Sequence, residues 1–172
     1  MKQSLTEKPV YLRAPTPWDA ADVYDLVRRS KPLDPNSVYC YILLCDHFRS
    51  TCIVAESESQ LVGFISAYIP PGRKDTVFVW QVAVDEAMRN RSLATKMLKS
   101  LLARDELSGL HRLETTVTPS NRVSMAFFKA FASKLGAPFS TGSGYGAELF
   151  GDEGHEEELL ITIGPFVRAQ PR

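Results

Sequence analysis

The spacing of hydrophobic residues changes several times along the chain, and each change marks a boundary between predicted elements. Residues 10–13 are typical of a short strand. Thr16-Pro17-Trp18-Asp19 then supplies an N-cap, a proline at the first helical position and an acid at the third, which predicts a helix to about Arg29. After a break at 30–35, a second helix over residues 36–48 is predicted by the spacing of Tyr39, Ile42, Leu43 and Phe48.

The middle of the chain predicts three strands followed by a helix. Residues 51–55 and 61–69 form a predicted hairpin around a polar turn, and residues 76–84 form a third core strand. Beyond Asp85 the hydrophobic period lengthens from two to between three and four, so a helix is predicted to begin near Arg91. One face of this helix carries Leu93, Met97, Leu98, Leu101 and Leu102.

The last third of the chain predicts a further strand, a helix and a final strand. Residues 111–117 form the strand, and residues 122–135 form a helix that Gly136 ends. The inward face of that helix is predicted to carry Met125, Phe128 and Phe131. The glycine-rich residues 137–154 are predicted to be a loop, and residues 158–164 the last strand.

Composition limits the size and the partners of the fold. A chain of 172 residues with 44% hydrophobic content suits one core, so a single domain is expected over residues 8–168, with flexible termini at 1–7 and 169–172. Twenty basic residues balance twenty acidic ones, which argues against nucleic acid or an anionic membrane as a partner. We therefore expect a ligand that is recognised by local charge.

The cysteines and histidines indicate neither disulfides nor a metal site. There are three cysteines, without a CxxC pair, and three histidines that are scattered along the chain. The first nine residues lack the apolar run of a signal peptide, and no apolar stretch is long enough to cross a bilayer. We expect a soluble protein of a reducing cytoplasm.

The segment from Val82 to Ala94 carries the first functional motif. A core strand leads into a helix through a short polar loop, where exposed amides and the side chains of Arg89 and Arg91 would attract linked phosphates. The segment resembles the pyrophosphate loop Q/R-x-x-G-x-G/A of the GNAT superfamily of acetyl-CoA-dependent N-acetyltransferases. The alternative is an ordinary turn with two solvated arginines. The residues predicted to bind the cofactor here are Val82, Ala83, Val84, Arg89, Asn90, Arg91, Ser92, Leu93 and Ala94.

The match to this loop is incomplete, because Asn90 and Ser92 stand where glycines are usual. A second segment, Asn121 to Phe131, resembles the GNAT pattern N-x-x-A-x-x-[FL]-Y-x-x-x-G-F. The resemblance implies that Asn121 faces the pantetheine arm of acetyl-CoA, although the residue also suits a helix N-cap. Phe128 takes the place of the tyrosine that often protonates the departing thiolate, and phenylalanine has no proton to donate.

The GNAT resemblance implies an α/β (α+β) fold with a single mixed, mostly antiparallel sheet flanked by helices. A closer resemblance, at residues 33–48, 51–55, 80–84, 116–121, 155–158 and 163–165, is to the L-2,4-diaminobutyrate acetyltransferases of ectoine biosynthesis. That family transfers acetyl from acetyl-CoA to the 4-amino group of the diamino acid. It also implies a cytoplasmic homodimer that serves the osmotic stress response.

A substrate with two ammonium groups needs carboxylates, polar groups and an aromatic face. The predicted substrate-binding residues are Asp34, Asn36, Tyr39, Trp80, His155 and Glu158. Asp34 could instead be a turn residue before Pro35, and Trp80 a core aromatic; most of the acidic run 152–158 could simply be solvated. The expected mechanism is direct attack in a ternary complex, with amides near Val82 and Ala83 polarising the thioester carbonyl. Glu158 or His155 is the predicted base, since the amine must lose a proton.

Two other functions stay open at this point. A non-catalytic acyl-CoA sensor would use the same cofactor loop without an acceptor pocket. Alternatively, a GNAT enzyme could acetylate protein N-termini, aminoglycosides or polyamines, because each of these presents an amine to the same thioester. A cysteine nucleophile is disfavoured, because none of the cysteines has a histidine and an acid in a recognisable arrangement.

Overall fold

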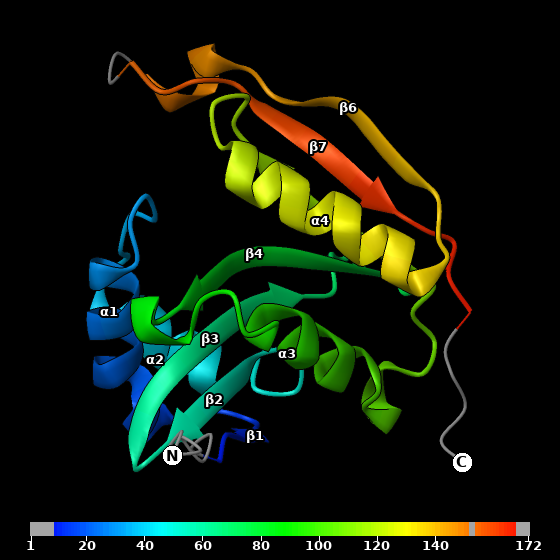
Figure 1. Ribbon diagram of the computed structural model, residues 1–172. Coiled ribbons are helices and arrows are strands. Elements are labelled where there is room, and N and C mark those ends of the chain that lie inside the picture. The colour runs from blue at the N-terminus through cyan, green and yellow to red at the C-terminus, as the bar shows by residue number, and fades with distance from the viewer. Residues whose placement is uncertain (1–8, 152–153, 168–172) are drawn as a thin grey trace, which may run out of the picture. The chain divides into compact units, whose positions relative to one another are not determined.

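The computed structural model describes residues 9–151 and 154–167, so the predicted flexible termini lie outside the described residues. The helices are α1 (Ala20–Arg29), α2 (Val38–Asp46), α3 (Leu93–Leu102) and α4 (Arg122–Leu135). The strands are β1 (Tyr11–Arg13), β2 (Ile53–Ser57), β3 (Gln60–Tyr68), β4 (Thr76–Val84), β5 (Arg112–Val117), β6 (Phe139–Tyr145) and β7 (Glu158–Ile163) (Figure 1). Short 3-10 turns occur at Pro17–Asp19, Glu86–Met88, Asp105–Leu107 and Ala147–Phe150.

The strands form one sheet in the order β1-β2-β3-β4-β5-β7-β6. The pairs β1–β2, β2–β3, β5–β7 and β6–β7 are antiparallel, whereas β4 and β5 are parallel. This arrangement confirms the predicted mixed, mostly antiparallel sheet. The described residues group into two compact units. The first consists of the described residues within 1–66 and 81–101, and the second of those within 67–80 and 102–172.

The first unit packs helices on both faces of its strands. On one face, α1 and α2 cover the cross-strand pair Val54–Phe64, and Tyr41 of α2 contacts the Phe64 ring edge-on at 6.1 Å. On the other face, the pair Ala55–Gly63 lies under Met97 of α3. A methyl group on Gly63 would meet the Met97 sulfur at 2.7 Å, so the glycine lets α3 approach the sheet closely.

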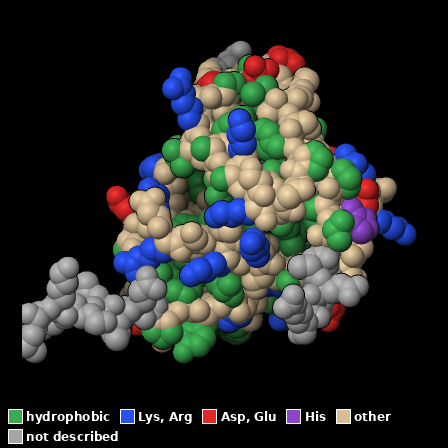
Figure 2. Space-filling view, turned by 45° about the vertical axis from the view of Figure 1, so that its right-hand side comes forward, with side chains coloured by type: hydrophobic (Ala, Val, Ile, Leu, Met, Phe, Trp, Pro, Cys, Tyr) green, Lys and Arg blue, Asp and Glu red, His purple; other side chains and the backbone are tan. Residues whose placement is uncertain are grey.

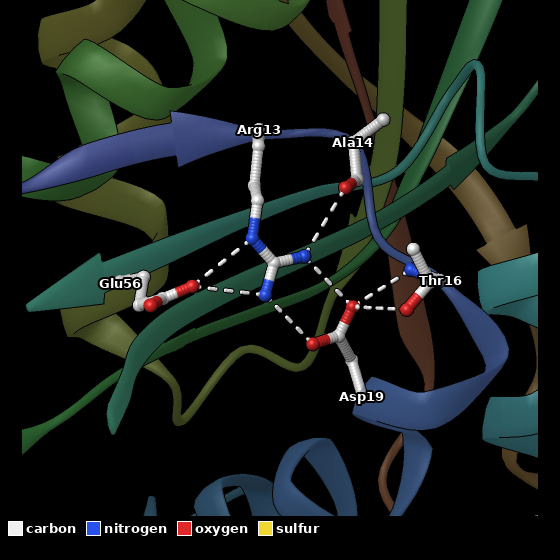
Figure 3. Close-up of polar contacts among 5 residues, drawn as sticks. All are labelled: Arg13, Ala14, Thr16, Asp19 and Glu56. Carbon is white, nitrogen blue, oxygen red and sulfur yellow. Dashed lines mark hydrogen bonds and ion pairs between the residues drawn. The ribbon is translucent and has the colours of Figure 1, made fainter. Parts of the chain in front are cut away.

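A network around Arg13 fixes the start of the first unit (Figure 3). The Arg13 guanidinium donates two 2.8 Å hydrogen bonds to the Asp19 carboxylate and one of 3.0 Å to Glu56 on the neighbouring strand. Asp19 also accepts from the Thr16 amide and hydroxyl, at 2.7 and 3.1 Å. The predicted capping box of Thr16 and Asp19 is therefore present, and Arg13 ties it to β1 and β2.

In the second unit, β4 pairs with β5 from Thr76–Arg112 to Phe78–Glu114. The buried carboxylate of Glu114 forms an ion pair with Arg73 at 2.7 Å. This contact holds the loop before β4 against β5. Phe128 and Phe131 of α4 are buried as predicted, and Gly136 ends this helix with a left-handed φ of 62°. The helix α4 and the strand β7 both belong to this unit.

Three local predictions are corrected. Residues 137–154 are not simply a loop, because they contain β6 and a 3-10 turn. The strand β6 is rich in glycine and largely exposed, but it forms because β7 supplies the partners for its backbone hydrogen bonds. The helix α3 begins at Leu93 rather than near Arg91. In α2 the buried face consists of Tyr41, Leu44 and Cys45, whereas Tyr39 is 67% exposed.

No helix within residues 9–151 and 154–167 is long and apolar enough to cross a membrane. The three cysteines are free thiols.

On the face drawn in Figure 2, Lys and Arg side chains are interspersed with hydrophobic and uncharged ones. The charge of the full chain sums to zero, so binding of a charged ligand depends on local groups.

The Asp19 network predicts a defined pH dependence of stability. Burial alone would raise the pKa of Asp19, but the hydrogen bonds from Arg13 and Thr16 outweigh it and lower the pKa below its usual value. A lowered pKa stabilises the fold above about pH 4, and this contribution is lost as the pH falls through the folded-state pKa. Asp19→Asn should therefore cost about 1–3 kcal/mol of unfolding free energy at pH 7, and less at pH 3, in urea denaturation.

Asp25→Asn is the matched control, because within the described residues Asp25 forms only an exposed i,i+3 ion pair with Arg28. We expect this variant to unfold within about 0.5 kcal/mol of the wild type at both pH values. If Asp19→Asn lowered the unfolding free energy by the same amount at pH 7 and at pH 3, the lowered pKa of Asp19 would be contradicted.

Candidate active site

The loop between β4 and α3 is anchored at its first residue. The Asp85 amide donates to the carbonyl of Val62 at 2.9 Å, and its carboxylate accepts from the Ala87 amide at 3.0 Å. The same carboxylate pairs with Arg29 of α1 at 3.2 Å, and Arg29 also donates to the Leu61 carbonyl. The loop thus begins from a fixed point that joins β3, β4 and α1.

Two residues of this loop have left-handed backbone conformations. Asn90 has a φ of 62° and Ser92 a φ of 59°. Ser92 stands at the central glycine of the GNAT pattern, and Asn90 at another position where glycine is frequent. Asparagine tolerates this conformation better than most residues, while serine has no such preference. The substitutions therefore keep the backbone path that glycine usually provides, at a cost in strain.

The helix α3 presents the amides of its first turn directly after these residues. Its first intrahelical bond runs from the Lys96 amide to the Ser92 carbonyl at 3.0 Å, so the amides from Leu93 to Thr95 precede the helical hydrogen-bond ladder. Arg89 and Arg91 are exposed beside them. Amides at a helix N-terminus together with two guanidinium groups suit the oxygens of a pyrophosphate.

The predicted acceptor residues of the first unit lie just before and within α2. Asp34 is exposed, Asn36 is half-buried and Tyr39 projects outward. The carbonyl of Asp34 and the amide of Asn36 are both bonded to buried side chains, those of Gln81 and Tyr41. Sequence analysis did not select Gln81 or Tyr41, because an isolated glutamine in a strand and a tyrosine in a helix have no distinctive pattern.

In the second unit, the side chain of Trp80 is accessible, whereas that of Asn121 caps a helix. Trp80 is 43% exposed, so it is not a fully buried core aromatic and its ring is accessible to a ligand. Asn121 is the N-cap of α4 and accepts from the Ser124 amide at 3.1 Å, as the capping alternative predicted. Phe128 is 4% exposed and packs edge-on against Phe127.

His155 and Glu158 face each other in the second unit. His155 Nδ1 lies 2.6 Å from the carbonyl oxygen of Glu156, which can only accept, so Nδ1 carries a proton. In the neutral ring Nε2 is then the acceptor, and it lies 3.9 Å from the Glu158 carboxylate. The ring stacks on Phe150 with a centroid distance of 4.0 Å. This geometry favours a proton on Nδ1 and places Nε2 beside the Glu158 carboxylate.

The acidic run around these residues is not uniformly solvated. Asp152 and Glu153 lie outside the described residues, and Glu157 is exposed. Glu156 instead binds Ser120, accepting a hydrogen bond from its hydroxyl and one of 3.3 Å from its amide. A cavity of about 410 Å³ nearby is lined by Pro119, Gly146, Ala147, Glu148, Glu156 and Glu157.

The predicted site residues are divided between the two units. The first unit holds Asp34, Asn36, Tyr39, Val82, Ala83, Val84, Arg89, Asn90, Arg91, Ser92, Leu93 and Ala94; the second holds Trp80, Asn121, Phe128, His155 and Glu158. Trp80 and Gln81 are neighbours in β4, so this strand belongs to both. The described residues contain no group of three or more His, Cys, Asp or Glu side chains that could hold a metal ion.

A cysteine nucleophile is unfavourable on physical grounds. Cys45 and Cys52 are both buried. Burial raises the pKa of the Cys45 thiol to about 12, and the neighbouring Cys52 adds to this shift. At neutral pH the group is therefore a thiol, which is a poor nucleophile.

Residues 20–132 match the model of the acetyltransferase (GNAT) family. The chain is 47% identical over 154 residues to the L-2,4-diaminobutyric acid acetyltransferase of Marinococcus halophilus. This match covers 90% of the present chain and 89% of the Marinococcus protein. It is 42% identical over 161 residues to the corresponding protein of Methylotuvimicrobium alcaliphilum, covering 94% of each chain. The chain belongs to this family of acetyltransferases.

A solved structure agrees with these relatives. The diaminobutyrate acetyltransferase EctA from Paenibacillus lautus, in complex with its substrate L-2,4-diaminobutyric acid and coenzyme A, superposes with a TM-score of 0.89 at 42% identity. The match covers 95% of this chain and 99% of that one. The GNAT fold, expected from the loop and α4 motifs, is thereby confirmed, and so is acetyl-CoA as the co-substrate.

The left-handed conformation of Ser92 gives a direct test of the cofactor loop. Ser92→Val should lower the free energy of unfolding by about 1–2 kcal/mol, because a β-branched side chain is strained at positive φ, and should weaken coenzyme A binding in calorimetry. Ser92→Gly should be at least as stable as the wild type. The control is Ser108→Val, at an exposed serine with an ordinary φ of −62°. If Ser92→Val and Ser108→Val lowered the free energy of unfolding equally, strain at the positive φ of residue 92 would be excluded as the cause of the lost stability.

Proposed function

We propose that this acetyltransferase moves the acetyl group of acetyl-CoA to the 4-amino group of L-2,4-diaminobutyrate, giving N4-acetyl-L-2,4-diaminobutyrate for ectoine biosynthesis. The observation that carries the proposal is the match, over about nine-tenths of the chain, to diaminobutyrate acetyltransferases at 42–47% identity. One of these proteins was solved with this diamino acid and coenzyme A bound.

Acceptor recognition is assigned to side chains that complement the two ammonium groups of a small diamino acid. Asp34 offers an exposed carboxylate on a loop whose backbone is held by hydrogen bonds, and Trp80 offers an accessible aromatic face. Carboxylates and aromatic faces both attract ammonium groups. Asn36, Tyr39, His155 and Glu158 complete the proposed set of acceptor-binding residues.

The cofactor is assigned to the β4–α3 segment. The pyrophosphate would bind the first amides of α3, with Arg89 and Arg91 as additional donors. Val82 and Ala83 lie near the end of β4, just before the cofactor loop, and their amides are our assignment for polarising the thioester carbonyl. Asn121 and Phe128 are the proposed residues for the pantetheine arm.

The transfer is direct. The neutral 4-amino group attacks the thioester carbon and forms a tetrahedral adduct. As the adduct collapses, its nitrogen loses a proton and the carbon–sulfur bond breaks, and this proton passes through water to the departing coenzyme A thiolate. The ammonium must first lose a proton, and the Nε2 atom of neutral His155, facing Glu158, is suited to accept it directly or through water. Phe128 has no acidic proton, so the thiolate takes its proton from another donor.

The cellular setting is part of the same proposal. An enzyme that consumes acetyl-CoA for osmolyte synthesis works in the cytoplasm, during osmotic stress. We also propose a homodimer, as the family resemblance implies. Sedimentation velocity of the purified chain would check the dimer.

The first prediction concerns the choice of acceptor. When the purified chain is incubated with acetyl-CoA and separate amines, mass spectrometry should find one added acetyl group on L-2,4-diaminobutyrate. Polyamines, aminoglycosides and peptides should give far less product. Acetylation of another amine instead of diaminobutyrate would contradict the substrate, whereas coenzyme A binding without any acetylated amine would favour a sensor.

The second prediction concerns the acid beside His155. Glu158→Gln should lower kcat by roughly 100-fold, because it removes the carboxylate beside the proposed base His155 and so weakens general-base catalysis, whose contribution is typically of that order or larger. Glu157→Gln removes an equal charge from an exposed neighbour and should keep kcat within about twofold of the wild type, as changes at solvated side chains usually do. Similar kcat values for the two variants would show that Glu158 has no role in proton removal.

A further inference from the structure

The side chain of Gln81 is buried in β4, where its polar atoms have to find partners inside the protein. It is 7% exposed, and its Nε2 donates to the carbonyl oxygen of Asp34 at 3.1 Å. Its Oε1 accepts from the Tyr41 hydroxyl at 3.2 Å, and its backbone amide donates to Ser66 Oγ at 3.1 Å. A buried amide in a strand is therefore bonded to the loop that carries the proposed acceptor carboxylate.

Tyr41 makes the second connection to the same loop. This residue is fully buried, with its ring packed edge-on between Tyr24 and Phe64. Its hydroxyl donates to Gln81 and accepts from the backbone amide of Asn36 at 3.1 Å. Since the hydroxyl both donates and accepts, loss of the oxygen atom would leave the Asn36 amide and the Gln81 carbonyl without these partners.

The two anchors flank a proline. Gln81 holds the carbonyl of Asp34, Tyr41 holds the amide of Asn36, and Pro35 lies between them with its φ fixed by its ring. Few backbone torsions are then left free in this stretch. The directions in which the Asp34 and Asn36 side chains leave the backbone follow from the fixed peptide groups.

We infer that the buried Gln81–Tyr41 pair is a positioning device for the acceptor loop, which sets the affinity for diaminobutyrate without touching it. The inference rests on the proposed function of Asp34 and Asn36. The inference also connects the acceptor loop with the cofactor through β4. Gln81 is followed directly by Val82 and Ala83, whose amides are assigned to the thioester carbonyl. Orientation of the acceptor carboxylate and of the thioester carbonyl thus depends on one strand.

Tyr41→Phe tests this role with the smallest possible change. We expect the KM for diaminobutyrate to rise roughly five- to tenfold, the effect of one or two lost hydrogen bonds. The KM for acetyl-CoA should stay within about twofold, because the β4–α3 loop is anchored separately by Asp85 and Arg29. Hydrogen exchange of the Asn36 amide should become faster, a readout that is independent of catalysis.

Tyr24→Phe is the matched control, because Tyr24 packs on the same ring and its hydroxyl makes no hydrogen bond within the described part of the chain. It should leave both KM values unchanged. Gln81→Met is a second variant, which removes the donor to Asp34 without adding a charge and should also raise the KM for diaminobutyrate selectively.

Equal rises of both KM values in Tyr41→Phe, or no rise in either, would overturn the inference while an active wild type upholds the proposed function. A wild type that does not acetylate diaminobutyrate would overturn the proposed function, and the inference with it.

Discussion

A buried glutamine side chain can donate two hydrogen bonds and accept two, and the cost of leaving them unmade forces its surroundings into a definite arrangement. In this protein the surroundings of Gln81 are the loop at Asp34 and the phenol of Tyr41. The strand that carries Gln81 continues into Val82 and Ala83 and then into the loop that precedes α3. Much of the proposed chemistry in the first unit therefore depends on the position of β4.

The phosphate-binding end of β4 shows that backbone path can be kept while residue type changes. Asn90 and Ser92 adopt the left-handed conformation that glycine would adopt without strain. The strain is sustained because the loop is held before these residues by Asp85 and after them by α3. A motif search that requires glycine would have missed this loop, although the amides it presents are those that a pyrophosphate needs.

Much of the fold followed from the sequence, because hydrophobic period and capping residues are local signals. The limits of α4, its N-cap Asn121 and its end at Gly136 were predicted from these signals alone. The strand β6 was missed, because its pairing with β7 is a non-local property and its glycines resemble a loop. The buried face of α2 and the roles of Gln81 and Tyr41 were also missed, since they depend on which side of a helix or strand meets the core. The site residues beyond the cofactor loop came from family resemblance, and their roles stay predictions.

The position of the acetyl group on the product tests the central claim most directly. Proton and carbon NMR of the product made from L-2,4-diaminobutyrate and acetyl-CoA should show an amide proton coupled to the terminal CH2 group, with the 2-amino group still free. A coupling to the CH group at carbon 2 instead would mean that the acceptor binds in the opposite orientation, and would contradict the account of this enzyme.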